Sequence, residues 1–234
     1  MNLNYKIVPR QEITAEQRRT MFELLESHYA NAFWPQFNAD LDEKHWAILL
    51  FCPQTDKLVG FSTQVLLEPV DNCHILYSGD TIIAREYWGS ITLPVAFLEL
   101  VNKIKAAHPG DRLFWMLISK GLRTYKFLSV FLTEYYPHHT LQTPEQVKAM
   151  MNLTGTRKFG QKFKPEKGII EAGANDQYLK EEYQPDENKS NPVASFFFSA
   201  NPEYTKGDEL LCFAELSDDN IHPFIKRVVK NYVH

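Results

Sequence analysis

The segment 77–89 holds the side chains of this sequence that are best suited to chemistry, and it reads Tyr-Ser-Gly-Asp-Thr-Ile-Ile-Ala-Arg-Glu-Tyr-Trp-Gly. Asp80 follows Gly79 inside an otherwise apolar run. Partial removal from water would raise the pKa of this carboxyl toward neutral pH, where its carboxylate could accept a proton from a reacting group. Gly79 predicts a local bulge that would turn Asp80 or Tyr77 into a cleft. The alternative is a structural aspartate that accepts hydrogen bonds from backbone N–H groups or from Arg85.

The same segment runs from a strand into a turn that opens a helix. Unpaired backbone N–H groups and the positive end of the helix dipole gather at such a turn, which makes it suitable for a phosphate or another anion. An ordinary turn between a strand and a helix has the same pattern, so the turn alone predicts no ligand.

Local signals predict the elements that would position this segment. Thr14 and Gln17 match a capping box, and Leu93, Phe97 and Leu100 recur at helical spacing. A turn-rich stretch through Pro35 and Asp40 follows the first helix. Up to residue 137 we expect a strand at 5–9, a helix after Thr14, a hairpin of strands at 46–51 and 58–65, a strand at 73–84, a helix from 90–93 to about 108, a strand at 113–118 and a helix that ends before Pro137.

Residues 73–137 therefore alternate strand, helix, strand and helix. Two strands joined through a helix are expected to lie parallel by a right-handed crossover, and the upstream hairpin makes the sheet mixed. Beyond residue 137 we expect a short helix at 143–151, a polar loop at 180–191, strands at 193–198 and 209–214, and a last helix at about 223–232.

This order of elements, together with the residues at 77–89, resembles the GNAT (Gcn5-related N-acetyltransferase) fold over about residues 5–137. The resemblance implies transfer of an acyl group from coenzyme A to an amine. It implies that the backbone of Ile82, Ile83 and Ala84 binds the pantetheine arm. It also implies that the loop at Trp88, Gly89 and Ser90 holds the pyrophosphate.

The loop departs from the family pattern Arg/Gln-x-x-Gly-x-Gly/Ala, because the aligned residues are Trp-Gly-Ser-Ile-Thr-Leu at 88–93. Ile91 and Leu93 are bulky where small residues let a diphosphate approach the backbone. Either the coenzyme sits differently, or the donor is a thioester on an acyl carrier protein. The sequence leaves both open.

Acyl transfer needs a proton acceptor for the amine, and the departing thiolate benefits from a donor. We predict Asp80 as the base. The resemblance implies a tyrosine acid on the helix after the fifth strand, and Tyr125 is the nearest counterpart, although the family's asparagine before that helix is absent. A buried structural tyrosine is the alternative.

Composition and residue spacing argue against several kinds of protein: a nucleic-acid-binding protein, a metalloprotein and a membrane-spanning protein. The formal charge of −4, from 25 basic and 29 acidic residues, argues against a nucleic-acid partner. No spacing among eight histidines and three cysteines matches a metal site, so we expect no metal. An odd cysteine count, no signal-peptide pattern and no run of about 18 apolar residues predict a cytoplasmic protein without a membrane span.

We therefore expect an α/β fold with a mixed, mostly antiparallel GNAT-type sheet flanked by helices. Residues 1–137 would form the acyltransferase core, and residues 138–234 would form a C-terminal extension packed on the same domain. The expected function is N-acyl transfer from acyl-CoA or a carrier-protein thioester to the amine of a small molecule or peptide. Numerous aromatic residues, 31 in all, favour a long-chain fatty acyl group over acetyl. The alternative is an inactive GNAT-like module that binds a carrier protein or peptide.

Overall fold

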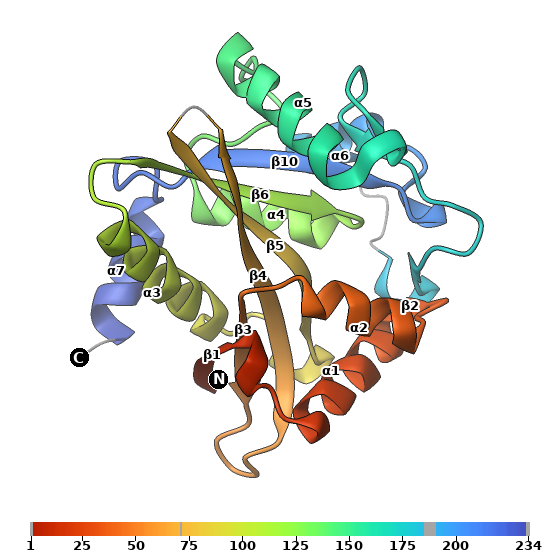
Figure 1. Ribbon diagram of the computed structural model, residues 1–234, viewed down its shortest axis with the longest axis vertical. Coiled ribbons are helices and arrows are strands. Elements are labelled where there is room, and N and C mark those ends of the chain that lie inside the picture. Colours follow the sequence, from red (N-terminus) through yellow and green to blue (C-terminus); the bar gives the residue numbers. More distant parts are fainter. Residues whose placement is uncertain (1, 71, 185–190, 233–234) are drawn as a thin grey trace.

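A computed structural model describes residues 2–70, 72–184 and 191–232 (Figure 1). Eight strands form one mixed sheet in the order β1-β3-β4-β5-β6-β10-β8-β7. They are β1 (Asn4–Pro9), β3 (Trp46–Phe51), β4 (Leu58–Val70), β5 (Cys73–Ile83), β6 (Arg112–Ser119), β7 (Phe163–Lys164), β8 (Ile169–Ile170) and β10 (Glu209–Glu215). The short strands β2 (Tyr29–Ala30) and β9 (Tyr178–Leu179) pair with each other outside this sheet.

Within the described residues, β5 and β6 make the one parallel pair of the large sheet, and α3 (Thr92–Ala107) joins them. All other neighbouring strands in it are antiparallel. The predicted strand-helix-strand unit and the predicted α/β fold with a mixed, mostly antiparallel sheet are therefore confirmed.

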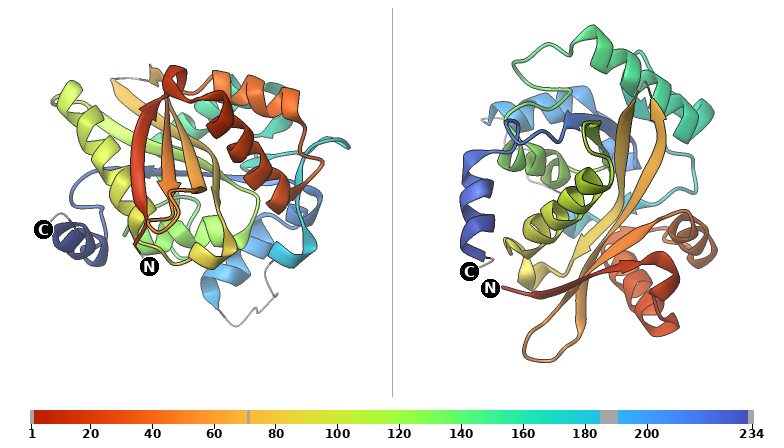
Figure 2. Two further views of the ribbon diagram at one scale, coloured as in Figure 1. Left: turned by 90° about the horizontal axis from the view of Figure 1, so that it is seen from below. Right: turned by 60° about the vertical axis from the view of Figure 1, so that its left-hand side comes forward.

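Helices cover both faces of the sheet, and Figure 2 shows α3 on one side and α1 on the other. The first face packs against α3, α4 (Leu122–Phe131), α6 (Pro192–Ala200) and α7 (Pro223–Tyr232). The second face packs against α1 (Ala15–His28), α2 (Trp34–Asp42) and α5 (Glu145–Phe159). Among the described residues, no helix is both long and apolar enough to cross a membrane.

Several helices begin as the sequence predicts. Thr14 caps α1 through its side chain, and Gln17 completes the capping box. Helix α3 begins at Thr92, so Pro94 lies in its first turn, where a missing N–H costs little. The residues of α3 that recur at helical spacing are buried.

Two predictions of local structure are wrong. The stretch through Pro35 and Asp40 is helix α2, whose Phe37 and Leu41 are buried one turn apart. Residues 193–198, predicted as a strand, lie in helix α6, where the Asn191 side chain accepts hydrogen bonds from the first N–H groups. A run of aromatic residues suits either structure, and the cap decides for a helix.

Two further boundaries differ from expectation. The helix predicted to end at Met151 continues to Phe159 as α5. The polar loop predicted at 180–191 begins with a short 3-10 helix at Glu181–Tyr183, and its residues 185–190 lie outside the described part of the chain.

Candidate active site

The sheet opens where β5 leaves β6. The two strands pair from Cys73 to Ser78 on β5, whereas β5 continues to pair with β4 as far as Ile83. In the described chain, residues 79–83 therefore have no strand partner on the β6 side, and β5 diverges from β6 there (Figure 1). Backbone N–H groups on that side of β5 have no partner in a neighbouring strand and can meet a ligand.

A bulge lies at the start of this opening. Ser78 pairs with Gln64 and Thr81 pairs with Ser62, so the two residues Gly79 and Asp80 both face the single residue Thr63 on β4. This two-against-one arrangement defines a β-bulge and confirms the bulge predicted at Gly79.

A chain of polar side chains, buried except for the exposed Thr81 at its end, holds the strand on both sides of the bulge. The Trp115 indole N–H donates to Ser78 Oγ at 2.8 Å, and Ser78 donates to Gln64 Oε1 at 2.6 Å. Gln64 Nε2 donates to Ser62 Oγ at 2.7 Å, and that hydroxyl lies 2.7 Å from Thr81 Oγ1. Satisfied buried polar groups of this kind fix one register, so the bulge position is strongly specified.

The bulge faces α1 and α2, and there the structure gathers a charged cluster. We use this name for Asp40, Lys44, Asp80, Lys120 and Glu209. Lys44 Nζ lies 2.6 Å from Asp40 Oδ1, with the lysine side chain fully buried. Lys120 Nζ lies 3.4 Å from Glu209 Oε1. The Asp80 side chain, in contrast, has no hydrogen bond or ion pair with any other described residue. The structural interpretation of Asp80, with Arg85 or backbone N–H groups as partners, is therefore not supported.

Burial and the nearby Asp40 carboxylate raise the pKa of Asp80 to about 6, against the opposing effect of Lys44 and Lys120. Burial also raises the pKa of Glu209, and Lys120 opposes that rise. Three carboxylates thus face two ammonium groups in a partly dry environment. The cluster is suited to a ligand that brings one positive charge, such as a protonated amine.

Two phenols border the charged cluster. Burial first, and then the carboxylates of Asp80 and Glu209, raise the pKa of Tyr29. The pKa of Tyr77 is raised by burial and by Glu209. Lys120 Nζ lies 5.4 Å from the centre of the Tyr29 ring, and Lys44 Nζ lies 5.6 Å from that of Tyr77. Both phenols stay protonated near neutral pH and can donate hydrogen bonds.

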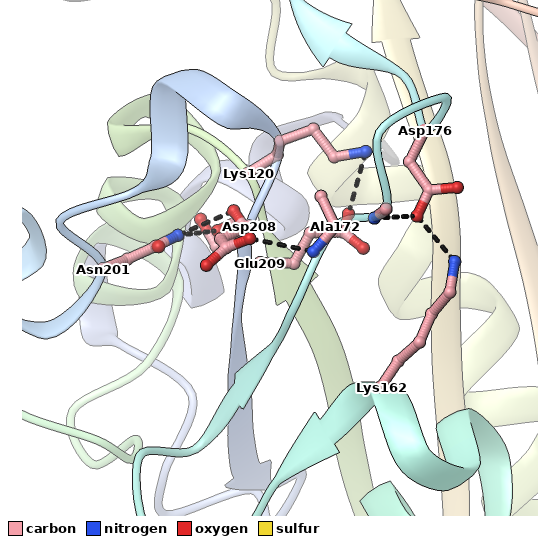
Figure 3. Close-up of polar contacts among 9 residues, drawn as sticks. Lys120, Lys162, Ala172, Asp176, Asn201, Asp208 and Glu209 are labelled. Carbon is pink, nitrogen blue, oxygen red and sulfur yellow. Dashed lines mark hydrogen bonds and ion pairs between the residues drawn. The ribbon is translucent and has the colours of Figure 1, made fainter.

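A loop of the C-terminal extension lies beside Lys120 and Glu209 (Figure 3). Asp208 Oδ1 accepts from Ala172 N at 2.8 Å, and Asp176 Oδ2 accepts from Lys162 Nζ at 2.6 Å. An open depression of about 400 Å³ lies there, and its lining includes Gly173, Tyr178 and Lys206. The extension therefore contributes one wall next to the charged cluster.

Of the three residues predicted to bind the pantetheine arm, some already use their backbone N–H and C=O groups within the protein, and others face the opening. Ala84 N donates to Val59 O, and Ala84 O accepts from Tyr87 N, so both Ala84 groups are used. Because backbone groups alternate sides along a strand, Ile82 also faces β4, while Thr81 and Ile83 face the opening. The Trp88 indole N–H donates to Ile83 O at 2.8 Å, which is consistent with this direction. Of the three predicted residues, Ile83 is thus the one placed to meet a donor, and Thr81 joins it.

The predicted phosphate loop offers a limited set of amides. Trp88 N donates to Arg85 O, and Ser90 N donates to Tyr87 O. Gly89 has φ +85°, with nothing within 4 Å of its missing Cβ, so its backbone is exposed to an approaching group. Helix α3 begins without a side-chain cap, and Pro94 in its first turn has no N–H.

Trp88 lies across the mouth of the opening. Its ring stacks against the Arg123 guanidinium of α4, whose carbon lies 3.4 Å from the ring centre. On β5 the same indole is bonded to Ile83 O, and Tyr183 packs edge-on against the ring at 5.9 Å. A donor that enters here must displace this ring or pass beside it.

Tyr125 is not brought to Asp80. Its side chain lies in the core on the α3 and α4 face, fully buried against Tyr135 and Phe197. The hydroxyl donates to Pro137 O at 2.9 Å, and burial raises its pKa. The acid role of Tyr125 remains a prediction that this placement disfavours.

Sequence reasoning missed most of the charged cluster. Asp40 and Lys44 stand four residues apart, a spacing that signals an ion pair once α2 is identified as a helix. Lys120 and Glu209 meet because β6 and β10 are neighbours, and no short-range pattern indicates that pairing.

Comparison with known proteins gives distant structural similarity. No protein-family model matches the chain. No curated protein sequence matches it. An acetyltransferase from Trypanosoma brucei is 15% identical with a TM-score of 0.38, over 61% of this chain and 98% of its own. An integron cassette protein of Vibrio cholerae is 16% identical with a TM-score of 0.43, over 68% and 99%.

A GNAT family N-acetyltransferase from Escherichia coli, solved in complex with CoA, is 10% identical with a TM-score of 0.41, over 61% of this chain and 74% of its own. The functional conclusion for this chain therefore rests on its own residues. Its strand order, its parallel β5–β6 pair and the opening between them agree with the fold that the sequence resemblance implies.

Proposed function

We propose that this protein is an N-acyltransferase that moves an acyl group from a thioester donor to an amine. The observation that carries the proposal is the opening of the sheet at the bulge, which places Asp80 beside the free edge of β5. Backbone N–H groups on that edge would hold the thioester carbonyl, and the charged cluster would receive the amine from the other side.

In the proposed reaction the amine nitrogen attacks the thioester carbon, a C–N bond forms and the C–S bond breaks. The proton lost by the amine passes to Asp80, whose pKa of about 6 keeps it ionised at pH 7 and above. The N–H groups of Thr81 and Ile83 would stabilise the negative charge that develops on the carbonyl oxygen. The thiolate takes up a proton on leaving, which balances the reaction.

The phenols of Tyr29 and Tyr77 are better placed than Tyr125 to donate that proton. Both lie within the electrostatic influence of Asp80, and both remain protonated at neutral pH. We assign Asp80 as the base and leave the choice between these two phenols to mutation.

The donor is a thioester of CoA or of a carrier protein. The bulky loop at Ile91 and Leu93 and the missing N–H of Pro94 weaken a diphosphate site on the backbone. Arg85 and Arg123 both lie near Trp88, at 5.8 and 3.4 Å from its ring centre, and offer an alternative cationic contact for a phosphate. A donor with a single phosphate fits this arrangement at least as well as CoA.

The number of aromatic residues does not support a long-chain acyl group as the substrate. Most of the aromatic residues behind that expectation pack against each other in the core. Phe37, Phe131, Tyr135 and Phe197 are at most 4% exposed. Trp88 is the member of that set whose described contacts reach the opening, through Ile83 O, so we propose no preference for acyl length.

One observation favours a second candidate, a non-catalytic module that binds a carrier protein or peptide. Trp88 bridges β5 and α4 across the site where a pantetheine arm would enter. If this ring stays in place, a thioester has to pass beside it to reach Asp80.

Thermal-shift titrations with acetyl-CoA, octanoyl-CoA and palmitoyl-CoA separate the two candidates when they are run on the wild type and on Trp88→Ala. The enzyme is expected to be stabilised by at least one acyl-CoA and to release free thiol when primary amines or a lysine peptide are added. The variant removes the bridge and is expected to bind donors more tightly if the ring must move. No stabilisation and no thiol release in either protein, with acyl phosphopantetheine also tested, would reject acyl transfer.

A further inference from the structure

At the opposite end of β5 from the bulge, three potential metal ligands come together from separate elements. His74 is the second residue of β5, His108 caps the C-terminus of α3, and Asp111 precedes β6. One ligand atom from each lies within 4.8 Å of the other two. His74 Nε2 and Asp111 Oδ2 are 2.9 Å apart, and the two imidazole rings have centroids 4.0 Å apart.

We propose that His74, His108 and Asp111 bind a divalent transition-metal ion, with Zn²⁺ as the ion that best suits the donor set. Two imidazoles and one carboxylate are common protein ligands of zinc, and they leave a fourth position for water. The proposal is independent of the acyl-transfer function, because these residues lie away from the opening and the charged cluster.

The geometry needs a small adjustment. Zinc bond lengths of about 2.1 Å place tetrahedral ligand atoms about 3.4 Å apart, so the His74 and Asp111 atoms, now 2.9 Å apart, have to separate by about 0.5 Å. His108 has to close by no more than about 1.5 Å, which a side-chain rotation supplies.

The backbone around the ligands is already ordered. His108 N donates to Ile104 O and Lys105 O at the end of α3, and Asp111 N donates to His108 O at 3.3 Å. Gly110 between them has φ +89°, a conformation that allows this tight reversal. His74 is held in register opposite Leu113 of β6. Ordered ligands lower the entropy cost of binding an ion.

The hydrogen bond between His74 Nε2 and Asp111 limits the affinity for a metal ion. With Nε2–H donating to Asp111, the buried Nδ1 is a bare acceptor without a partner among the described residues. A metal on Nε2 moves the proton to Nδ1, where no acceptor supports it. Loss of such an outer partner commonly costs 10–100-fold in affinity, so we expect micromolar binding rather than the nanomolar binding of a fully supported site.

The test uses the full chain without a polyhistidine tag. Co²⁺ is titrated at pH 7.5 while its visible absorption bands are recorded, and Zn²⁺ is then added as a competitor. We expect a saturable spectrum with one ion per chain, displaced by Zn²⁺, and a rise in melting temperature with Zn²⁺.

The variants His108→Gln and Asp111→Asn are expected to weaken Co²⁺ binding at least 10-fold. Both side chains are partly exposed, so these variants should fold, and melting without metal checks this. The matched control is His138→Gln combined with His139→Gln, a second histidine pair with ring centroids 4.2 Å apart, where His138 Nδ1 accepts from Thr140 N and Leu141 N. The proposal would be overturned if the control variant lost as much Co²⁺ affinity as the site variants, or if the site variants bound Co²⁺ as tightly as the wild type. It would also be overturned if the wild type showed no visible Co²⁺ absorption bands up to 1 mM Co²⁺.

Discussion

The pKa of Asp80 is set by two opposing electrostatic effects. Burial and the carboxylate of Asp40 disfavour its charged form, whereas Lys44 and Lys120 favour it. Burial is the larger influence, and the resulting pKa of about 6 lies close to the pH at which a general base works well. The same side chain lacks a partner of its own, so its ionised form is held at a cost in stability.

The first prediction concerns rate. In the wild type, kcat/KM should rise as pH increases through about 6, because Asp80 must lose its proton before it can accept one. Asp80→Asn should lower kcat/KM by about 100-fold and remove this acidic limb. Thiol release from the acyl-CoA that stabilises the protein best, with a panel of primary amines, measures both. If kcat/KM of Asp80→Asn still rises as pH increases through about 6, the general base is another residue.

The second prediction concerns stability. The folded pKa of Asp80 lies above its unfolded value of about 3.9, so the native state binds more protons between pH 4 and 6, and stability falls as pH rises through that window. Asn does not titrate. Asp80→Asn should therefore raise the free energy of unfolding at pH 8, by up to about 3 kcal/mol, and change it little at pH 4. Urea unfolding at both pH values is the measurement, and a gain of equal size at both would contradict the pKa.

The third prediction separates Tyr125 from the chemistry. Tyr125→Phe removes the hydrogen bond to Pro137 O and leaves that acceptor unpaired, so we expect a loss of about 1–2 kcal/mol in unfolding free energy. Turnover should stay within about twofold of the wild type. A large fall in kcat with unchanged stability would restore the acid role of Tyr125.

At the scale of elements, the bulge of β5 depends on how closely α2 approaches the strand. The segment that follows α2 brings Lys44 over Gly79, and the lysine then turns back to pair with Asp40. A Cβ atom on Gly79 would lie 2.7 Å from Lys44 Cε and 2.7 Å from Thr63 Oγ1. The absence of a side chain at residue 79 is thus what lets the charged cluster form above the bulge.

The fourth prediction follows from this packing. Gly79→Ala should force Lys44 and Thr63 apart, lower the unfolding free energy by about 1–3 kcal/mol and reduce turnover together with it. Gly173→Ala is the matched control, because the nearest atoms to its added Cβ lie at 3.6 Å or more. The control should unfold like the wild type in urea. Similar losses in both variants would show that the effect is not specific to the bulge.

At the scale of the whole molecule, the C-terminal extension completes the sheet that carries the site. Strand β10 pairs with β6 along six residues, and its Leu211, Cys212 and Phe213 are fully buried. The extension also supplies Glu209 to the charged cluster. Core and extension therefore share one hydrophobic interior.

The fifth prediction tests this sharing. A chain ending at residue 137 would expose the edge of β6 and the apolar surface that β10 covers, so we expect it to aggregate or to remain unfolded. The full chain should unfold in a single transition when followed by circular dichroism and by tryptophan fluorescence. A soluble, folded fragment 1–137 would show that the extension is an independent unit.

Much of the fold could be predicted because its signals are short in range. The capping box at Thr14, the apolar spacing of α3 and the β3–β4 hairpin each lie within about 20 residues of sequence. Helices α2 and α6 were missed where apolar and aromatic residues suit two structures equally and where packing or a cap decides.

The sequence by itself determined that a small residue precedes a carboxylate inside an apolar strand, which is enough to predict a bulge and a base at Gly79 and Asp80. Only the tertiary structure decided what surrounds them. Asp40, Lys44, Lys120 and Glu209 arrive from the α2 region, β6 and β10, and Trp88 reaches across to Arg123. Local propensities act between near neighbours in the chain. The pairing of distant strands and the packing of helices decide which charged side chains meet. The pKa of Asp80 depends on every one of those charges and on burial, so it follows from the tertiary structure.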